Sequence, residues 1–406
     1  MRILISNPSL QYTRSTVKAL LDSGHEVMFA TAYWYRSDRL FEKIFGATRL
    51  KKYLQRHSDA QIPLTSVIDN QWGRLLFFGV KLLPVSVEQK SFWQDRMQDR
   101  WVSKLLRRWK PQLVIGYEKS CLLTFKAASE LNAVKWLDLS QVHPSFIDSL
   151  RKDFSFFKDI TGAESKFRQI SKHKILEYGL ADTIFCLSDF AAGTLVQNGI
   201  SHSKIMVNPL GYNPNIFFPS AKKEKKRNQP LRLVYAGIIT KRKGVHVLLE
   251  SLESFSEDAV QLTLIGPAGD ASTLLNHHLH KPNITYIPFL SQAELANELR
   301  KADVFVFPSF LDSWAAVVVE AMACGLPVVV TENTGAAQLV TEQTGRIIPV
   351  NDVTAIRNAI LFFLDNPEVS GQMGLKASEA VQPYSWLRYH DQLNQLLEQE
   401  MLNNHV

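Results

Sequence analysis

The 406-residue chain is long enough for two domains of about 200 residues each, and its composition, 46% hydrophobic and 21% charged, excludes a disordered or fibrous protein. Its net charge of +7 is unevenly divided, because residues 1–219 hold 30 basic and 19 acidic side chains whereas residues 231–406 hold 11 and 19. The basic excess is spread along the first half without a recognition motif, so we expect no nucleic-acid partner and different partners for the two halves.

Short apolar runs alternate with helical periods along the whole chain. In the first half these runs are 2–6, 26–30, 113–116, 134–139, 183–187 and 204–208. In the second half they are 231–236, 261–265, 284–288, 304–307, 327–330 and 346–349. Continuous apolar strands indicate burial on both faces, so the pattern predicts two doubly wound α/β domains with parallel sheets. Such domains bind ligands outside the carboxyl ends of their strands, and two facing edges would leave one deep cleft.

The stretch 91–109 is a predicted helix with two possible roles. Its apolar face is predicted to carry Phe92, Trp93, Met97, Trp101 and Leu105, with Arg96, Arg100, Lys104, Arg107 and Arg108 among them. The first interpretation is a helix that packs on its own sheet. The second is an element that helps the basic half rest on an anionic membrane, as a peripheral protein does.

The charged run 220–230, which ends in proline, reads as a connector. We therefore predict a first domain over 1–210, a linker over 211–230 and a second domain over 231–384. The last helical stretch, 385–406, is expected to pack back on the first domain.

The most informative region spans 307–327 and reads as strand, loop, helix, glycine stop and proline-led strand. Asp312 lies in the loop, and Ser313 is a predicted N-cap for a helix that begins near Trp314. The free N–H groups of such a helix end would seat a diphosphate. Glu320, eight residues after Asp312 and flanked by valines, is suited to the hydroxyl pair of a ribose.

This region resembles the E-x-x-x-x-x-x-x-E motif of the retaining glycosyltransferases of family 4, which have the GT-B fold. Other stretches resemble the same family in order and spacing: 24–27, 181–188, 209–213, 231–237, 241–245, 262–266 and 302–309. The resemblance is strong over 181–350 and weaker over 1–150.

The resemblance implies roles for residues of the second half. Glu320 would hold the donor ribose, Asp312 would touch the hydroxyls of the transferred sugar, and Lys243 would neutralise the diphosphate. The backbone at Phe289 and Leu290 would lie along the nucleobase. The remaining donor-binding positions are Gly237, Arg242, Ser313, Trp314 and Ala315.

In the first half, the resemblance implies that Asp138 and His143 face the donor across the cleft and join Asp312 in catalysis. A histidine before a proline, as His143 is, also fits a purely structural role. The family transfers sugars with retention and without a metal, so no metal and no cofactor are expected beyond the nucleotide-sugar co-substrate.

The chain departs from the family pattern at four places. Asp312 replaces the first glutamate, and Ile238 follows Gly237 where arginine is usual, so that Lys241 or Arg242 would supply the missing charge. Ser313 and Ala315 stand where glycine is common. After the first strand, residues 7–9 replace a glycine pair.

The three cysteines, Cys121, Cys186 and Cys324, are an odd number without metal-type spacing, which predicts reduced thiols in a cytoplasmic protein. The amino terminus lacks the apolar run of a signal peptide, and no apolar stretch reaches the length of a membrane span.

We therefore expect a retaining, metal-independent hexosyltransferase that uses a UDP- or GDP-linked sugar. Its acceptor would be a glycan or lipid-linked molecule in polysaccharide or glycolipid synthesis. A catalytically silent binding module of the same fold is the alternative, and a sugar-phosphate synthase or phosphorylase remains open. A dinucleotide-dependent oxidoreductase is disfavoured because no G-x-G-x-x-G follows the first strand of either half.

Overall fold

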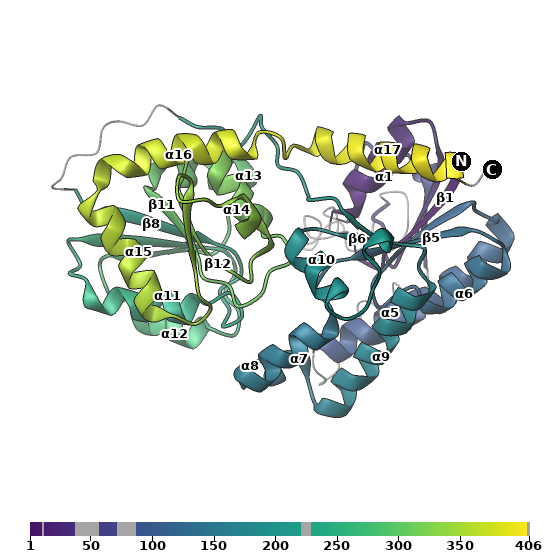
Figure 1. The fold of residues 1–406 in the computed structure, drawn as a ribbon, viewed down its shortest axis with the longest axis horizontal. Coiled ribbons are helices and arrows are strands. Elements are labelled where there is room, and N and C mark those ends of the chain that lie inside the picture. Colours follow the sequence, from purple (N-terminus) through teal and green to yellow (C-terminus); the bar gives the residue numbers. More distant parts are fainter. Residues whose placement is uncertain (10–11, 37–56, 71–86, 221–228, 404–406) are drawn as a thin grey trace. The chain divides into compact units, whose positions relative to one another are not determined.

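The computed structural model describes residues 1–9, 12–36, 57–70, 87–220 and 229–403. These residues form two compact units (Figure 1). Unit 1 comprises Met1–Cys186, Thr194–Asn208 and the chain from His390 onward, and unit 2 comprises Leu187–Gly193 and Pro209–Tyr389. Each unit is an α/β layer structure built on one parallel sheet.

In the described residues, the sheet of unit 1 has the strand order β3-β2-β1-β4-β5-β6-β7. Its strands are β1 (Arg2–Ser6), β2 (Glu26–Thr31), β3 (Val67–Asp69), β4 (Leu113–Tyr117), β5 (Val134–Leu139), β6 (Thr183–Cys186) and β7 (Ile205–Val207). Its helices are α1 (Thr13–Asp22), α5 (Val87–Trp109), α6 (Leu122–Glu130), α7 (Pro144–Asp153), α8 (Phe156–Thr161) and α9 (Glu164–Leu180). The chain order reverses between β1 and β4, so the carboxyl ends of these strands flank the natural binding edge of the unit.

The core strands explain why the sequence folds this way. Ile3, Leu4 and Ile5 of β1 are all fully buried, because β1 pairs with β2 and β4 and both of its faces are covered. β3 was not predicted.

Helix α5 confirms the predicted helix, but its buried face differs from the predicted one. Phe92, Asp95, Gln98, Asp99, Val102 and Leu106 are buried, whereas Met97, Trp101 and Leu105 are half-buried and Trp93 is exposed. The prediction missed this face because three of its members are polar. Asp99 accepts hydrogen bonds from the backbone N–H groups of Leu123 (2.9 Å) and Thr124 (2.8 Å) and so caps α6. Helix α5 therefore packs within its own unit, as in the first of the two interpretations.

In the described residues of unit 2, the sheet has the order β10-β9-β8-β11-β12-β13. Its strands are β8 (Leu231–Ala236), β9 (Val260–Ile265), β10 (Ile284–Ile287), β11 (Val304–Phe307), β12 (Val328–Thr331) and β13 (Gly345–Ile348). Its helices are α11 (Val245–Ser251), α12 (Ser272–His278), α13 (Gln292–Lys301), α14 (Ala316–Ala323), α15 (Val353–Asp365) and α16 (Pro367–Val381). Short 3-10 helices are Leu64–Ser66, His202–Lys204, Leu252–Ser254 and Gly335–Leu339.

Two helices contribute residues to both units: α10 (Asp189–Val196) and α17 (Trp386–Asn403). The amide of Gln392 donates to the carbonyl of Val207 (3.1 Å), so the later part of α17 packs on unit 1. Tyr212 and Phe217, within the predicted linker, are instead buried in unit 2, and residues 221–228 of that linker lie outside the described residues. Among the described residues no helix combines the length and apolarity needed to cross a membrane.

Candidate functional site

A cavity of about 210 Å³ opens in unit 2 at the carboxyl ends of β8 and β11. The chain order of the sheet reverses between these two strands, which is where α/β sheets bind ligands. Most of the lining comes from the turn after β8 and from the loop between β11 and α14. The lining residues are Leu187, Leu210, Ala236, Gly237, Lys243, Phe307, Asp312, Ser313, Trp314, Ala315, Ala316 and Val317.

The loop before α14 is organised by Asp312, and the predicted cap at Ser313 is wrong. One carboxylate oxygen of Asp312 accepts hydrogen bonds from the backbone N–H groups of Trp314 (3.1 Å) and Ala315 (2.8 Å). The helix begins at Ala316, because Ala315 has a left-handed backbone with φ 63°. This conformation explains why glycine is expected there. Ala316 and Val317, in the first turn of α14, line the cavity, and the N–H groups of a first turn have no partner within their own helix.

Two residues from two other connections, Ser188 after β6 and Gly335 after β12, hold the Asp312 loop, and neither contact was predicted from the sequence. Gly335 donates its N–H to the carbonyl of Asp312 (2.8 Å), and the hydroxyl of Ser188 donates to the carbonyl of Ser313 (2.7 Å). A Cβ on Gly335 would lie 2.1 Å from the Ser313 carbonyl oxygen, so only glycine fits. A glycine shortly after a buried strand was the available signal for this contact.

Lys243 and Asp312 form an ion pair in the cavity wall. Burial lowers the pKa of Lys243, while the pKa of Asp312 falls despite its burial because the ammonium group of Lys243 and the charge of Arg242 favour the carboxylate. The ammonium group also lies 5.1 Å from the ring centre of Phe307. The two side chains expected to meet the diphosphate and the sugar are therefore paired with each other.

Arg242 lies beside this pair, and its side chain is engaged with the protein. Its guanidinium donates to the carbonyl of Leu311 (2.8 Å), and its own carbonyl accepts the N–H of Phe310 (2.9 Å). Arg242 thus positions the Asp312 loop. The neighbouring Ile238 is half exposed.

Glu320 lies one turn beyond Ala316 on the half-buried face of α14, next to the two cavity-lining positions 316 and 317. Burial raises its pKa to about 7. Within the part of the chain that the structure describes, its carboxylate has no hydrogen-bonding or ionic partner. A half-buried carboxylate without a protein partner is the expected state of a group that meets a ligand.

Phe289 and Leu290 follow β10 at the same carboxyl edge, but they do not line the cavity. Phe289 is 63% exposed, so a large aromatic face stands open at the edge of the sheet.

Unit 1 holds the other two predicted catalytic residues. Asp138 is buried near the carboxyl end of β5 and accepts a short hydrogen bond from the hydroxyl of Tyr12. Burial raises its pKa to about 7, although hydrogen bonds from the hydroxyls of Tyr12 and Tyr117 act in the opposite direction. Asp138 therefore changes its charge close to neutral pH.

His143 is the N-cap of α7. Its Nδ1 accepts the backbone N–H of Ser145 (3.2 Å) and lies 2.5 Å from the hydroxyl oxygen of Ser145. Burial lowers the pKa of His143, so the ring is neutral at pH 7. The structural role foreseen for this histidine is thus real, and Nε2 is the ring atom left to meet a ligand.

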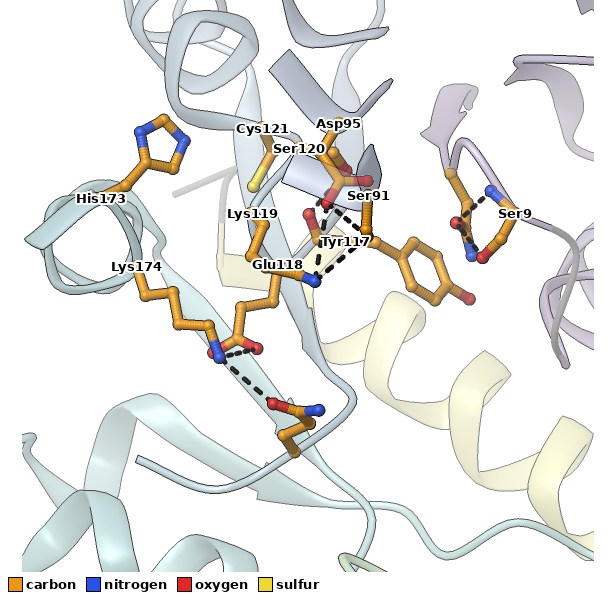
Figure 2. Close-up of polar contacts among 12 residues, drawn as sticks. Ser9, Ser91, Asp95, Tyr117, Glu118, Lys119, Ser120, Cys121, His173 and Lys174 are labelled. Atoms are coloured by element: carbon orange, nitrogen blue, oxygen red, sulfur yellow. Dashed lines mark hydrogen bonds and ion pairs between the residues drawn. The ribbon is translucent and has the colours of Figure 1, made fainter. Parts of the chain in front are cut away.

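Unit 1 also holds a network of charged side chains that are largely buried (Figure 2). Lys174 pairs with Glu118 (2.9 Å) and reaches Gln141 (3.4 Å), while Lys119 pairs with Asp95 (3.6 Å). The carboxylate of Glu177 binds the loop after β4 through the N–H groups of Lys119 and Cys121. This network fixes the carboxyl edge of the sheet next to Asp138.

We expect Asp138→Asn to remove a pH-dependent loss of stability. The pKa of Asp138 is raised in the fold. The protonated carboxyl group therefore makes its full contribution to the free energy of unfolding below pH 4, and this contribution is lost as the pH rises through 7. The variant should gain stability relative to the wild type between pH 5 and pH 8, on the order of 2–4 kcal/mol. The gain in stability is measured at pH 5 and pH 8 by methionine oxidation in graded urea, with Met28 as the reporter of unit 1 and Met322 as the reporter of unit 2. If the variant and the wild type differed in stability by the same amount at both pH values, titration of Asp138 would not be the cause.

Residues 217–380 match the family model described as glycosyl transferases group 1. A D-inositol 3-phosphate glycosyltransferase of Pseudarthrobacter chlorophenolicus is 28% identical over 55% of this chain and 57% of its own length. The chain thus spans little more than half the length of that relative.

Two solved structures resemble the whole chain. Sucrose-phosphate synthase of Thermosynechococcus elongatus has a TM-score of 0.73 at 19% identity and covers 99% of each chain. The Anabaena protein HepE in complex with UDP-glucose has a TM-score of 0.67 at 14% identity and covers 98% of this chain and 100% of its own. These likenesses establish the two-domain GT-B fold that the sequence predicted. The match to the family model, over 217–380, lies within unit 2.

Proposed function

We propose that this protein is a glycosyltransferase that binds a nucleotide-diphosphate sugar in the unit 2 cavity and transfers its sugar to a glycan or lipid-linked acceptor. One observation carries the proposal: Glu320, which has no partner among the residues that the structure describes, shares a face of α14 with two lining positions of a cavity that also contains Lys243. A carboxylate, a helix amino terminus and a cation together match a ribose and a diphosphate.

The proposed roles follow the geometry. The carboxylate of Glu320 accepts hydrogen bonds from the ribose hydroxyls, and the N–H groups at the start of α14 bind the diphosphate. The ammonium group of Lys243 partly gives up its ion pair with Asp312 and stabilises the charge that builds on the departing nucleotide. The carboxylate of Asp312 can then accept a hydrogen bond from a hydroxyl of the sugar.

The finer features of the reaction belong to the same proposal. They are retention of configuration, no requirement for a metal, a UDP- or GDP-linked hexose, and a site of action on the cytoplasmic side of a membrane. HepE is described in complex with UDP-glucose, which favours a uridine nucleotide as the first donor to test.

The test is donor hydrolysis by the full chain across UDP-, GDP- and ADP-sugars, with Glu320→Ala in parallel and Glu250→Ala as an exposed control on α11. We expect one donor to be cleaved by the wild type and the control, and a loss of about 10- to 100-fold in donor affinity for Glu320→Ala. An unchanged donor affinity in Glu320→Ala, read from the KM for the cleaved donor, would contradict the role of that residue.

The pKa of Glu320 adds a second measurement. Since burial raises this pKa to about 7, donor affinity should increase from pH 6 to pH 8 as the carboxylate ionises. The increase should vanish in Glu320→Gln.

A silent binding module is the second candidate, and the closed Lys243–Asp312 pair favours it. A donor that binds tightly but is never cleaved, alone or with any acceptor, would support this alternative.

A further inference from the structure

A second cavity is lined entirely by residues of unit 1. It has a volume of about 630 Å³, three times that of the donor cavity, and lies between α7 and α9. The lining residues of α9 recur every three or four positions: Glu164, Phe167, Arg168, Ser171, Lys172, Ile175 and Leu176. The first turn of α7 supplies the other wall, and we call this feature the α7–α9 groove.

The walls of the groove are mainly apolar. Phe167 and Pro144 are buried, whereas the neighbours Ile175 and Leu176 are 49% and 48% exposed. Adjacent large aliphatic side chains open to water in a concave site are the usual mark of a ligand-binding surface. The volume is also in the range of roughly 300–1,000 Å³ that small-molecule sites occupy.

Arg151 fixes the shape of the groove, because it ties α7 to the start of α9. Arg151 is buried, donates to the carbonyl of Gly162 (3.0 Å) and pairs with Glu164 (3.0 Å). Its guanidinium also stacks 4.3 Å from the ring centre of Phe167. A preformed groove loses little conformational entropy when it is filled.

The charges around the groove favour an anion. Asp148 pairs with Lys152 (2.8 Å), and Glu164 pairs with both Arg151 and Arg168, so the acidic lining residues are already neutralised. Lys172 is exposed and has no ion-pair partner among the residues that the structure describes. The rim therefore offers one uncompensated ammonium group beside an apolar surface.

One end of the groove is formed by His143, whose Nδ1 is engaged by Ser145. His143 is also one of the two residues of unit 1 to which the family resemblance gives a place in the reaction, the other being Asp138. One end of the groove thus reaches a predicted catalytic residue.

We propose that the α7–α9 groove binds the hydrocarbon part of an anionic, lipid-linked acceptor. The chain lies on Phe167, Ile175 and Leu176, and Lys172 pairs with the anionic group. The assignment of this ligand as the acceptor rests on the proposed function, whereas the binding of an anionic amphiphile does not.

The experiment measures binding of dodecyl phosphate, kept monomeric, to the full chain by isothermal titration calorimetry. Dodecyltrimethylammonium tests the charge, and inorganic phosphate tests the head group alone. The groove variants are Leu176→Gln and Lys172→Gln. Their matched controls are Leu387→Gln, an exposed leucine of α17, and Lys166→Gln, an exposed lysine of α9 outside the lining.

We expect dodecyl phosphate to bind more tightly than the cationic amphiphile or inorganic phosphate. Leu176→Gln should weaken binding about 10-fold or more, which corresponds to the loss of one buried aliphatic side chain. Lys172→Gln should reduce the preference for the anion several-fold, and both controls should bind as the wild type does.

Equal binding by Leu176→Gln and the wild type would overturn the proposal. So would equal affinity for inorganic phosphate, which would indicate an anion site only, or binding to anionic vesicles without binding of the monomer, which would indicate a membrane surface. Donor hydrolysis by the wild type is measured without amphiphile, so its failure would count against the proposed function and leave the groove result standing.

Discussion

Replacing Lys243 with methionine is expected to destabilise unit 2 by about 2–4 kcal/mol and to abolish donor turnover. Lys243 and Asp312 are both largely removed from water, so loss of the ammonium group leaves a carboxylate without its counter-charge. The backbone N–H groups of Trp314 and Ala315 still bind Asp312, which keeps the penalty below that of an isolated buried charge. Methionine oxidation in graded urea, read at Met322, gives the loss of stability.

The double variant Lys243→Met/Asp312→Asn separates the structural part of this effect from the chemical part. With the carboxylate neutralised, stability should return to within about 1 kcal/mol of the wild type, while turnover stays absent. Lys241→Met, two residues away and exposed, is the matched control. A double variant as unstable as the single one would show that the pair is not the cause.

Gly335→Ala is expected to have a comparable effect through sterics alone. The new Cβ would lie 2.1 Å from the carbonyl oxygen of Ser313 and 2.7 Å from the hydroxyl of Ser188. The Asp312 loop must move, and we expect a loss of about 2–4 kcal/mol together with weaker donor binding.

Gly371→Ala provides the control for this substitution. Gly371 lies within α16, and a Cβ added there meets nothing within 4 Å, so the variant should be neutral or more stable by about 0.5–1 kcal/mol. If Gly335→Ala bound the donor and unfolded as the wild type does, the loop would not depend on this contact.

The sequence predicted the framework well because of how the core strands are buried. The predicted strands 2–6, 134–139, 231–236 and 304–307 coincide with β1, β5, β8 and β11. Strands covered on both faces must be apolar throughout, so they appear directly in the sequence.

The loop around Asp312 could be predicted only in part. Its composition indicated a ligand-binding turn, but the capping group is Asp312, two to three residues before the residues whose N–H groups it accepts. The contacts that fix this loop come from Ser188 and Gly335, which are distant in sequence or belong to another connection. Local propensity carries no information about such partners.

The prediction of which face of α5 is buried failed for a related reason. Asp99 and Gln98 look solvent-facing in a helical pattern, yet they are buried because each satisfies backbone groups of another element. A buried polar residue with a long-range partner is invisible to hydrophobic periodicity.

The path of the chain between the units restricts how this protein can be recombined with its relatives. It passes from one unit to the other at residues 186–187, 193–194, 208–209 and 389–390. An exchange of the second unit alone, cut at the limits of the family match over 217–380, would leave Ser188 behind. The carbonyl of Ser313 would then depend on a serine from the recipient chain. A chimera should therefore carry 187–193 together with 209–389, so that the donor module is inherited as two segments.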